Sequence, residues 1–404
     1  FSDGTRVTVQ DVVASYEQAR QNVYYKGRFT HIARVELSSD GGVDFFLDTP
    51  YQNLALLLDI PIVKASEVTA DTPLGTGPYS LEDGIGGKHL QRVVGWWCSS
   101  DDLVAKDSSI ALVEAESPSQ IRDEFEFSGL SVVCTNPQTD SYADYRCDFE
   151  LWEVDSGFMM YIGCNVTYSK FFDDGTLRTF LTYGIDRQTL VDDNYGGLAL
   201  PTTLPISPMS PYYSKSLATN YDYDEMRFID AASKFRVPTN DKGVPRTLQL
   251  LVNSDDSARL RCARNIAATL TELGLACETV ESPTSVYEAR LQAANYDIYL
   301  GITKLPTTAD LSEFYRPWGE MSWGGLANET IYNMVNQSLA DRGNYYNLHK
   351  LVADDGRIIP VMAGYYAIYA KRGVLSDLNP ARDNVFYYTL GKTMESSKVA
   401  TQFS

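Results

Sequence analysis

Two tryptophans, a tyrosine, a methionine and an arginine lie close together at residues 315–325, where the sequence reads YRPWGEMSWGG. Aromatic faces provide a large contact area at low entropic cost, and glycine lets the backbone approach a ligand closely. Because loops often carry function, the segment predicts non-covalent recognition of a small molecule by Tyr315, Trp318 and Trp323. In the alternative interpretation, Trp318 and Trp323 pack under the loop and have only a structural role.

Residue types that would carry out a reaction are scattered along the chain. The three histidines, His31, His89 and His349, do not have the spacing of a metal dyad or a hydrolase triad. The glycines at 75 and 77 are followed by Pro78, which lacks the amide that a dinucleotide-binding loop needs. We therefore predict a binding protein and not an enzyme, with no cofactor and no metal site.

Charge and hydropathy narrow the classes of partner. The chain of 404 residues has a formal net charge of −19 and a pI near 4.6. Nucleic-acid-binding proteins need basic surfaces, so we expect no nucleic acid partner, and an anionic membrane surface is disfavoured as well. The acidic balance is typical of a highly soluble surface, and a cationic ligand is compatible with it but not established by it. No apolar run approaches the roughly 18 residues that cross a bilayer.

The six cysteines form an even set without C-x-x-C spacing. Three disulfides are therefore compatible with the sequence, whereas a structural zinc site is not expected. Cys262 and Cys277 flank a predicted helix-to-strand turn and fall at similar distances from it. Both a Cys262–Cys277 disulfide and two buried free thiols are compatible with that placement.

The region after residue 246 has the clearest periodicity. Strands are predicted at 248–252, 276–280 and 297–302, and helices at 260–273 and 286–294. Short connections between alternating strands and helices imply parallel pairing with right-handed crossovers. Further strands are predicted at 362–369 and 385–390.

The first residues also have a definite local structure. Asp3 and Gly4 predict a tight turn, and Thr8 lies three residues before Asp11, the spacing of a helix cap. Apolar residues then recur at helical spacing from Val12 to Ala19. A capped helix should therefore begin directly after Thr8.

Several segments resemble, in order, motifs of the family 5 extracellular solute-binding proteins, which are oligopeptide, dipeptide and nickel receptors of ABC importers. The matching segments are FSDGTRVTVQDVVASYEQA at 1–19, LGTGPYSL at 74–81, YIGCN at 161–165, YGIDR at 183–187, YDYD at 221–224 and the strand–helix region 248–302. Each match alone is weak. Their common order over nearly the whole chain makes the resemblance strong.

The resemblance implies an α/β fold with two lobes, a clamshell like that of the type II periplasmic binding proteins of the large cluster with an extra subdomain. Mixed sheets flanked by helices would form each lobe, and the lobes would close around a solute. Lobe I would comprise residues 1–167 and 366–404, and lobe II residues 168–365. Because the family's first motif lies well inside lobe I, we expect that the N-terminal part of lobe I precedes Phe1.

The resemblance also suggests where a solute binds. In peptide-binding relatives, the loop after the last strand of lobe II carries an acidic residue that pairs with the peptide α-ammonium. That position falls at Leu305 here, whereas Thr303 and Lys304 precede it. Lys304 suits a carboxylate, a phosphate or a polar solute, or it is a solvated loop lysine. Asp310 would replace the missing acidic group if the loop is remodelled.

The resemblance predicts a bacterial receptor that captures a peptide or similar small polar solute and delivers it to the permease of an ABC transporter. We expect a monomer, either periplasmic or an extracellular cell-surface lipoprotein, which contacts the membrane only through a lipid anchor outside this chain. A sugar, opine or metal-chelate receptor is the alternative with the same fold. An extracellular sensor or adhesin domain that contacts proteins is the alternative from another class.

Overall fold

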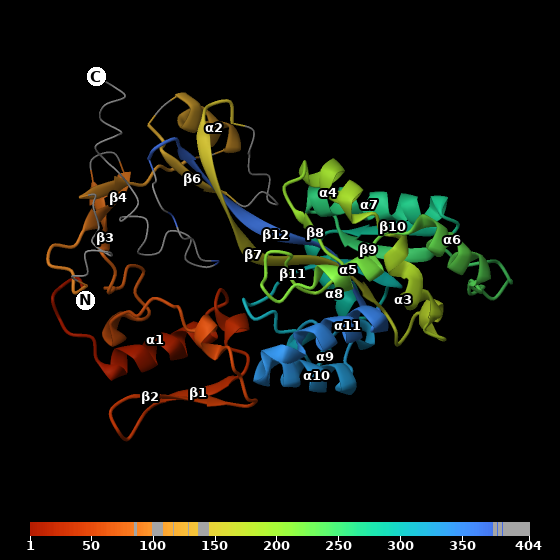
Figure 1. Ribbon diagram of the computed structural model, residues 1–404, viewed down its shortest axis with the longest axis horizontal. Coiled ribbons are helices and arrows are strands. Elements are labelled where there is room, and N and C mark those ends of the chain that lie inside the picture. Colours follow the sequence, from red (N-terminus) through yellow and green to blue (C-terminus); the bar gives the residue numbers. More distant parts are fainter. Residues whose placement is uncertain are drawn as a thin grey trace. The chain divides into compact units, whose positions relative to one another are not determined.

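The computed structural model describes residues 1–84, 87–98, 108–115, 117–127, 129–135 and 145–374, together with 378 and 382. The chain forms two compact units: unit 1 contains residues 1–154 and 366–404, and unit 2 contains residues 155–365. It passes between the units within two long strands, β7 (Phe149–Cys164) and β12 (Ile358–Lys371) (Figure 1). The lobe boundaries expected at 167/168 and 365/366 remain a prediction, and the strand predicted at 385–390 lies outside the described residues.

Unit 1 begins with the predicted capped helix, α1 (Val9–Gln21). Asp11 Oδ2 accepts a hydrogen bond from Thr8 N at 2.7 Å, and Thr8 Oγ1 accepts one from Asp11 N at 3.4 Å, so two amides of the first turn are satisfied. The buried face of α1 carries Tyr16 and Ala19, which pack with residues of β1 (Ile32–Leu37) and β2 (Val43–Leu47). The remaining described elements of unit 1 are β3 (Tyr79–Gly84), β4 (Gly87–Arg92), β5 (Ser109–Ala111), α2 (Pro118–Phe127) and β6 (Val132–Thr135).

Unit 2 contains the predicted parallel strands. β9 (Leu248–Asn253) pairs in parallel with both β10 (Cys277–Ser282) and β11 (Ile298–Lys304). The crossovers are α7 (Ser257–Glu272) and α8 (Thr284–Gln292), so the predicted strand–helix alternation is confirmed. Within unit 2 the described strands follow the order β10-β9-β11-β7-β12, and β8 (Leu200–Pro201) pairs with β12.

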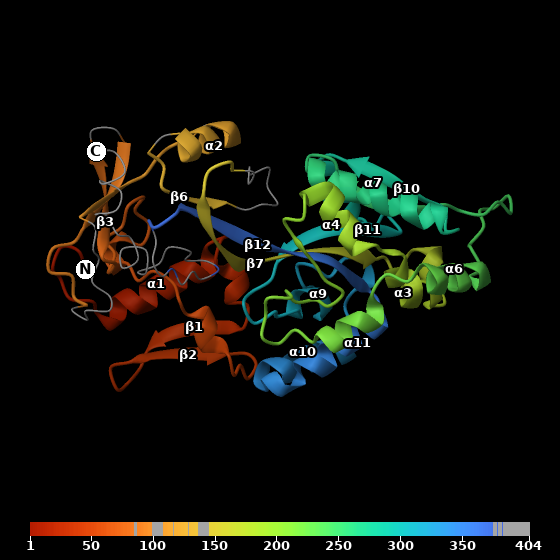
Figure 2. The same cartoon turned by 45° about the horizontal axis from the view of Figure 1, so that its top comes forward.

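Helices cover both faces of these strands. In Figures 1 and 2, α7 and α4 (Arg187–Tyr195) lie on one side of the strands of unit 2, and α9 (Ser312–Tyr315), α10 (Glu329–Ala340) and α11 (Tyr345–Asp355) lie on the other. The remaining helices are α3 (Thr176–Phe180), α5 (Lys215–Ala218) and α6 (Glu225–Lys234). Buried side chains of α7, among them Ile266 and Leu270, pack with Leu248 and Leu250 of β9 in the main core. The apolar periodicity seen in the sequence is therefore the face that α7 turns to the sheet.

The structure distinguishes between a Cys262–Cys277 disulfide and two free thiols. All six cysteines are among the described residues and all are free thiols. Cys262 is buried in α7 and Cys277 is half-buried in β10, so this pair forms no disulfide. Burial raises the pKa of both thiols, to about 12 in each case, which is typical of inert structural cysteines.

β7 and β11 pair through two reciprocal tyrosine–glycine contacts. In the antiparallel register, Tyr299 lies opposite Gly163 and Tyr161 lies opposite Gly301. A Cβ atom on either glycine would come within 3.0 Å of the opposing tyrosine ring. Each ring therefore lies over a strand position that only glycine can occupy, and the two phenol oxygens are 3.3 Å apart.

Buried His349 in α11 predicts an acid-sensitive core. Neither ring nitrogen has a hydrogen-bond partner among the described residues, and burial lowers its pKa from 6.5 to about 4. The unfolded chain then binds a proton between pH 6.5 and 4 that the folded chain does not. We therefore expect the free energy of unfolding to fall by up to about 3 kcal/mol as the pH is lowered from 6.5 to 4, at about 1.4 kcal/mol per pKa unit.

Urea denaturation between pH 4 and 7 tests this expectation. His349→Leu should flatten the pH profile in this window, whereas the control His89→Gln, at a partly exposed position in β4, should leave it unchanged. A profile of equal steepness in His349→Leu would show that other groups cause the acid sensitivity.

Candidate functional site

The segment predicted to bind a solute leaves the sheet at the end of β11. Thr303 and Lys304, the last residues of that strand, pair with Met159 and Phe158 of β7 and are half-buried. Leu305 then donates its backbone N–H to Gly157 O at 2.8 Å. Leu305 is only 7% exposed, so the position of the missing acidic anchor is buried. The binding roles predicted for Thr303 and Lys304 remain predictions.

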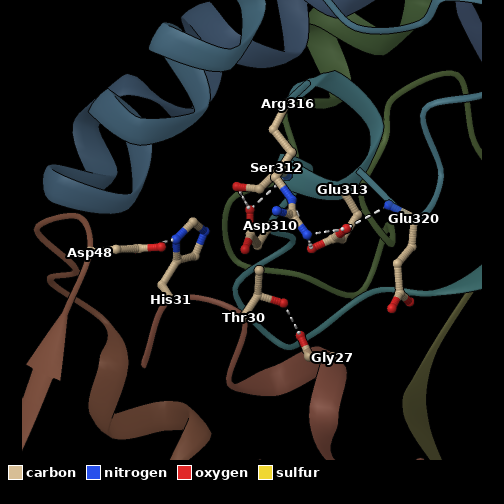
Figure 3. A network of polar contacts seen from close by, with 9 residues as sticks. All are labelled: Gly27, Thr30, His31, Asp48, Asp310, Ser312, Glu313, Arg316 and Glu320. Atoms are coloured by element: carbon tan, nitrogen blue, oxygen red, sulfur yellow. Dashed lines mark hydrogen bonds and ion pairs between the residues drawn. The ribbon is translucent and has the colours of Figure 1, made fainter. Parts of the chain in front are cut away.

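Asp310 shapes the start of α9. Its Oδ1 accepts hydrogen bonds from Ser312 N at 2.9 Å and from Ser312 Oγ at 2.6 Å (Figure 3). Just before it, the carbonyl of Thr308 accepts a hydrogen bond from Tyr345 Oη at 2.6 Å, which ties the turn to α11. These contacts give Asp310 a definite structural role, and its predicted contact with a solute remains a prediction.

Tyr315 lies in the core of unit 2. Its side chain is 0% exposed, and its hydroxyl has no hydrogen-bond partner among the described residues. Burial raises the pKa of Tyr315 well above its usual value. The neighbouring Phe314 packs edge-on against Tyr161, with ring centroids 5.1 Å apart. A solute would reach Tyr315 only if the loop moved, so its predicted binding role requires such a movement.

Glu313 organises the tip of the loop that follows α9. The guanidinium of Arg316 donates to the Glu313 carboxylate over 2.8–3.1 Å, and the backbone N–H of Glu320 donates to Glu313 Oε2 at 2.8 Å (Figure 3). The carbonyl of Glu313 also accepts a hydrogen bond from Met321 N at 3.1 Å. At the centre of this loop, Trp318 is 96% exposed and has a φ of +62°.

The far end of the loop is attached to the sheet. Trp323 is half-buried at the start of a short 3-10 helix, Trp323–Gly325. The carbonyl of Gly324 accepts hydrogen bonds from Val166 N at 2.9 Å and Thr167 N at 3.2 Å, just after β7. Arg357 Nη1 donates to Gly325 O at 2.9 Å. Positive φ values of +59° and +85° at Gly324 and Gly325 allow this turn, which favours glycine at both positions.

The structure thus separates the predicted aromatic residues into different environments. Tyr315 is buried, Trp323 is half-buried and Trp318 is exposed. The sequence-based prediction noted the arginine of this segment, Arg316, but neither Glu313 nor the pairing by which these two residues hold the loop around Trp318. The three-residue spacing of these opposite charges was a visible signal for an ion pair, but not for the additional capture of the Glu320 amide.

Two cavities of unit 2, of about 530 and 330 Å³, lie elsewhere, beside residues 219–224. They share Asp222 and Tyr223, and the larger is also lined by Tyr183 and Arg227. The Arg227 guanidinium carbon lies 3.7 Å from the centroid of the Tyr183 ring. None of the residues predicted to bind a solute lines either cavity, so these cavities are separate from the predicted binding segment.

The described residues contain no group of three or more His, Cys, Asp or Glu side chains placed to hold a metal ion. No helix among them is both long enough and apolar enough to cross a membrane.

Comparison of folds shows extensive similarity to known structures. A putative peptide-binding protein, AppA from Clostridium difficile, superposes with a TM-score of 0.77 at 15% identity, covering 98% of this chain and 86% of that one. NikA from Brucella suis, in complex with Fe(III)-EDTA, gives a TM-score of 0.73 at 17% identity, covering 95% and 83%. AppA from Bacillus subtilis, in complex with a nonapeptide, gives 0.62 at 17% identity, covering 96% and 83%. These likenesses confirm the predicted fold of the periplasmic binding proteins.

Sequence comparison identifies the family. The glutathione-binding protein GsiB of Escherichia coli (strain K12) is 24% identical over 244 residues, which cover 55% of this chain and 46% of that protein. This chain therefore spans about half the length of the curated relatives that it matches. The sequence profile described as "Bacterial extracellular solute-binding proteins, family 5 Middle" matches residues 1–325, most of the chain. The chain belongs to the family 5 bacterial extracellular solute-binding proteins.

Proposed function

We propose that the protein is the receptor of an ABC importer, which captures a peptide or similar small polar solute and delivers it to the permease. The observation that carries this proposal is the family match over residues 1–325. Relatives named for glutathione binding and a structural neighbour in complex with a nonapeptide support a peptide-like solute. Such a receptor acts by desolvating its solute and matching its hydrogen bonds, without a covalent step.

Extracellular location is part of the same proposal. The family's description gives its members as bacterial extracellular proteins. We also propose that the receptor is a monomer, that its partner is a permease, and that a lipid anchor provides any membrane contact.

The buried side chain of Leu305 supports a second candidate solute. In an ungapped match, Leu305 takes the place of the acidic residue that binds a peptide α-ammonium in relatives, and it is only 7% exposed. A carboxylate-bearing solute such as an opine or a metal chelate needs no such anchor. Structural neighbours in complex with agropinic acid and with Fe(III)-EDTA support this alternative.

Native mass spectrometry of the purified protein, compared with its denatured mass, tests the proposed function. A receptor that retains its solute should lose a small molecule on denaturation, and the mass of that molecule separates a peptide from a chelate or an opine. A clean unliganded mass, followed by no binding of added peptides, opines or chelates, would contradict the proposal and favour a protein-contact role.

Trp318→Ala is expected to weaken binding of the solute found in this way by about tenfold, since aromatic contacts often dominate recognition. The free energy of unfolding should change by less than about 0.5 kcal/mol, because the side chain is 96% exposed. Isothermal titration calorimetry and urea denaturation measure the two effects. Trp97→Ala, which removes a 70% exposed tryptophan of unit 1 outside the proposed site, is the control for affinity. Unchanged affinity would contradict the binding role of Trp318, and lost stability would show that its side chain contributes to the fold.

A further inference from the structure

The loop around Trp318 is closed by one side chain. The Glu313 carboxylate receives the guanidinium of Arg316 from one side of the loop and the backbone N–H of Glu320 from the other (Figure 3). The Glu313 and Arg316 side chains are 25% and 36% exposed, so the ion pair is partly shielded from water. We call these contacts of Glu313 with Arg316 and Glu320 the Glu313 clasp.

Close packing prevents the loop from relaxing. A Cβ atom at Gly319 would lie under 3.0 Å from the carbonyl oxygen of Glu313, so the backbone of residue 319 lies directly on α9. Arg316 N donates to Ser312 O at 2.9 Å and Gly319 N donates to Arg316 O at 3.2 Å, so one hydrogen-bonded turn ends just before Trp318 and the next one spans it. The conformation of residue 318 is therefore determined by its surroundings.

Trp318 is held in a conformation that a tryptophan does not prefer. Its φ of +62° lies in the left-handed region, which is unfavourable for a residue with a Cβ atom. The 96% exposed indole does not compensate for this strain by packing inside unit 2. A strained and exposed large side chain that a clasp maintains indicates a functional contact.

The residues around Trp318 indicate which kind of chemical group it would bind. The positive charge of Arg316 is matched by the Glu313 carboxylate, and the adjacent exposed residue is Pro317. Pro317, the exposed neighbour of Trp318, is apolar, and the exposed Glu320 lies two residues beyond Trp318. An indole face binds flat apolar or aromatic groups by stacking.

We propose that Glu313 is a positioning residue that holds Trp318 ready as a stacking surface for an aromatic or other flat apolar group of the solute. The inference rests on the proposed function, because it assigns one part of the solute to one part of the predicted binding segment. It narrows the proposed solute from a peptide or similar small polar solute to a peptide with such a side chain.

Two tripeptides, Ala-Phe-Ala and Ala-Ala-Ala, are the probes, and their dissociation constants are measured by calorimetry. The wild type should bind Ala-Phe-Ala at least about fivefold more tightly, as expected for one aromatic stacking contact. Glu313→Gln should reduce this preference to near unity and leave the affinity for Ala-Ala-Ala unchanged. A merely structural role of Glu313 would weaken both peptides alike.

Two further variants show whether Glu313 acts through Trp318. In a Trp318→Ala background, Glu313→Gln should have no additional effect on the preference. Arg316→Gln opens the clasp from its other side and should give the same loss, which keeps the test valid if Glu313→Gln fails to fold.

Glu17→Gln is the matched control. Glu17 forms the same three-residue ion pair with Arg20 at 2.8 Å and also accepts a backbone N–H, from Val35 at 3.0 Å, but it lies in unit 1 on α1. Its substitution should leave the preference intact.

The possible outcomes separate this inference from the proposed function. A wild type that binds both tripeptides equally, or a preference that survives Glu313→Gln and Arg316→Gln, overturns the inference and leaves the receptor function standing. Binding of neither tripeptide overturns the peptide class on which the inference rests. If native mass spectrometry also finds no solute, the proposed function falls as well.

Discussion

Replacing Arg187 with alanine is expected to lower the free energy of unfolding by about 3 to 5 kcal/mol, the range typical of a broken buried network. Arg187 is only 4% exposed, and in the described part of the chain its guanidinium donates to neutral oxygens. Burial lowers its pKa to about 10, so Arg187 remains charged at neutral pH. Its Nε donates to Pro360 O at 2.8 Å and its Nη2 to Thr182 Oγ1 at 2.8 Å.

Further bonds of the same guanidinium explain the size of the effect. Nη1 lies 3.2 Å from Thr182 O, 3.3 Å from Ile185 O and 3.5 Å from Tyr221 O. Arg187 therefore joins β12, the segment before α4 and the segment before α6. Truncation would leave several of these oxygens buried without a donor, which costs more than the loss of the bonds themselves.

Arg264→Ala is the control for the loss of an arginine. Arg264 is 56% exposed and pairs with Glu281 on the surface of unit 2, at 2.7 Å, so its removal should cost less than about 1 kcal/mol. Urea denaturation followed by circular dichroism measures both variants. Equal midpoints for the two variants would contradict the assigned role of Arg187.

Replacing Gly163 with alanine is expected to lower the free energy of unfolding by about 3 kcal/mol through overpacking. The new Cβ atom would come within 3.0 Å of the Tyr299 ring. Tyr299 is 1% exposed, and its ring is already in edge contact with Tyr161, at 5.7 Å, and with Tyr296, at 5.2 Å. The ring has no free space into which to move, so the strands themselves must separate.

A double-mutant cycle tests this cause. If the clash with Tyr299 is responsible, Gly163→Ala should cost far less in a Tyr299→Ala background than in the wild type. Gly27→Ala is the matched control, since a Cβ atom there would meet nothing within 4 Å, and we expect a change below about 0.5 kcal/mol. Additive effects at Gly163 and Tyr299 would rule out steric overlap as the cause.

The steric overlap of Gly163→Ala with Tyr299 also shows that the pattern of residue types does not determine strand register. The strand that contains Tyr299 was predicted from the sequence, and Gly163 lies in a segment that resembles a family motif. Their register was not predicted, because pairing is decided between segments 136 positions apart in the chain, as the pairing of Tyr299 with Gly163 shows. A shift by one residue would place each tyrosine on the other face of the sheet.

Local signals were reliable where the cause is local. The cap of α1 by Thr8 and Asp11 and the apolar stripe of α7 depend on atoms within a few residues of each other, and both are present. The parallel pairing of these strands followed from the short connections, which allow few alternatives. The family was also identifiable at this level, because its motifs follow one another in the same order.

The candidate site was only partly predictable. The aromatic segment at 315–325 was visible as a composition, but the sequence could not rank Tyr315, Trp318 and Trp323 by exposure. That ranking depends on α9, which turns Phe314 and Tyr315 into the core next to Tyr161. A helix of one turn has no periodic apolar pattern, so the elements that pack against it determine which of its side chains are buried.

The amino-acid sequence by itself therefore determined the family, the α/β class and the strand–helix alternation of residues 248–302, and it predicted a segment for solute contact. The tertiary structure decided that Trp318 is exposed and strained, that Tyr315 is buried, and that Glu313 closes the loop. The physical reason is the separation along the chain of the residues that interact. Periodicity and caps arise from neighbouring residues, whereas burial, register and the capture of a distant amide depend on which surfaces meet when the chain is compact.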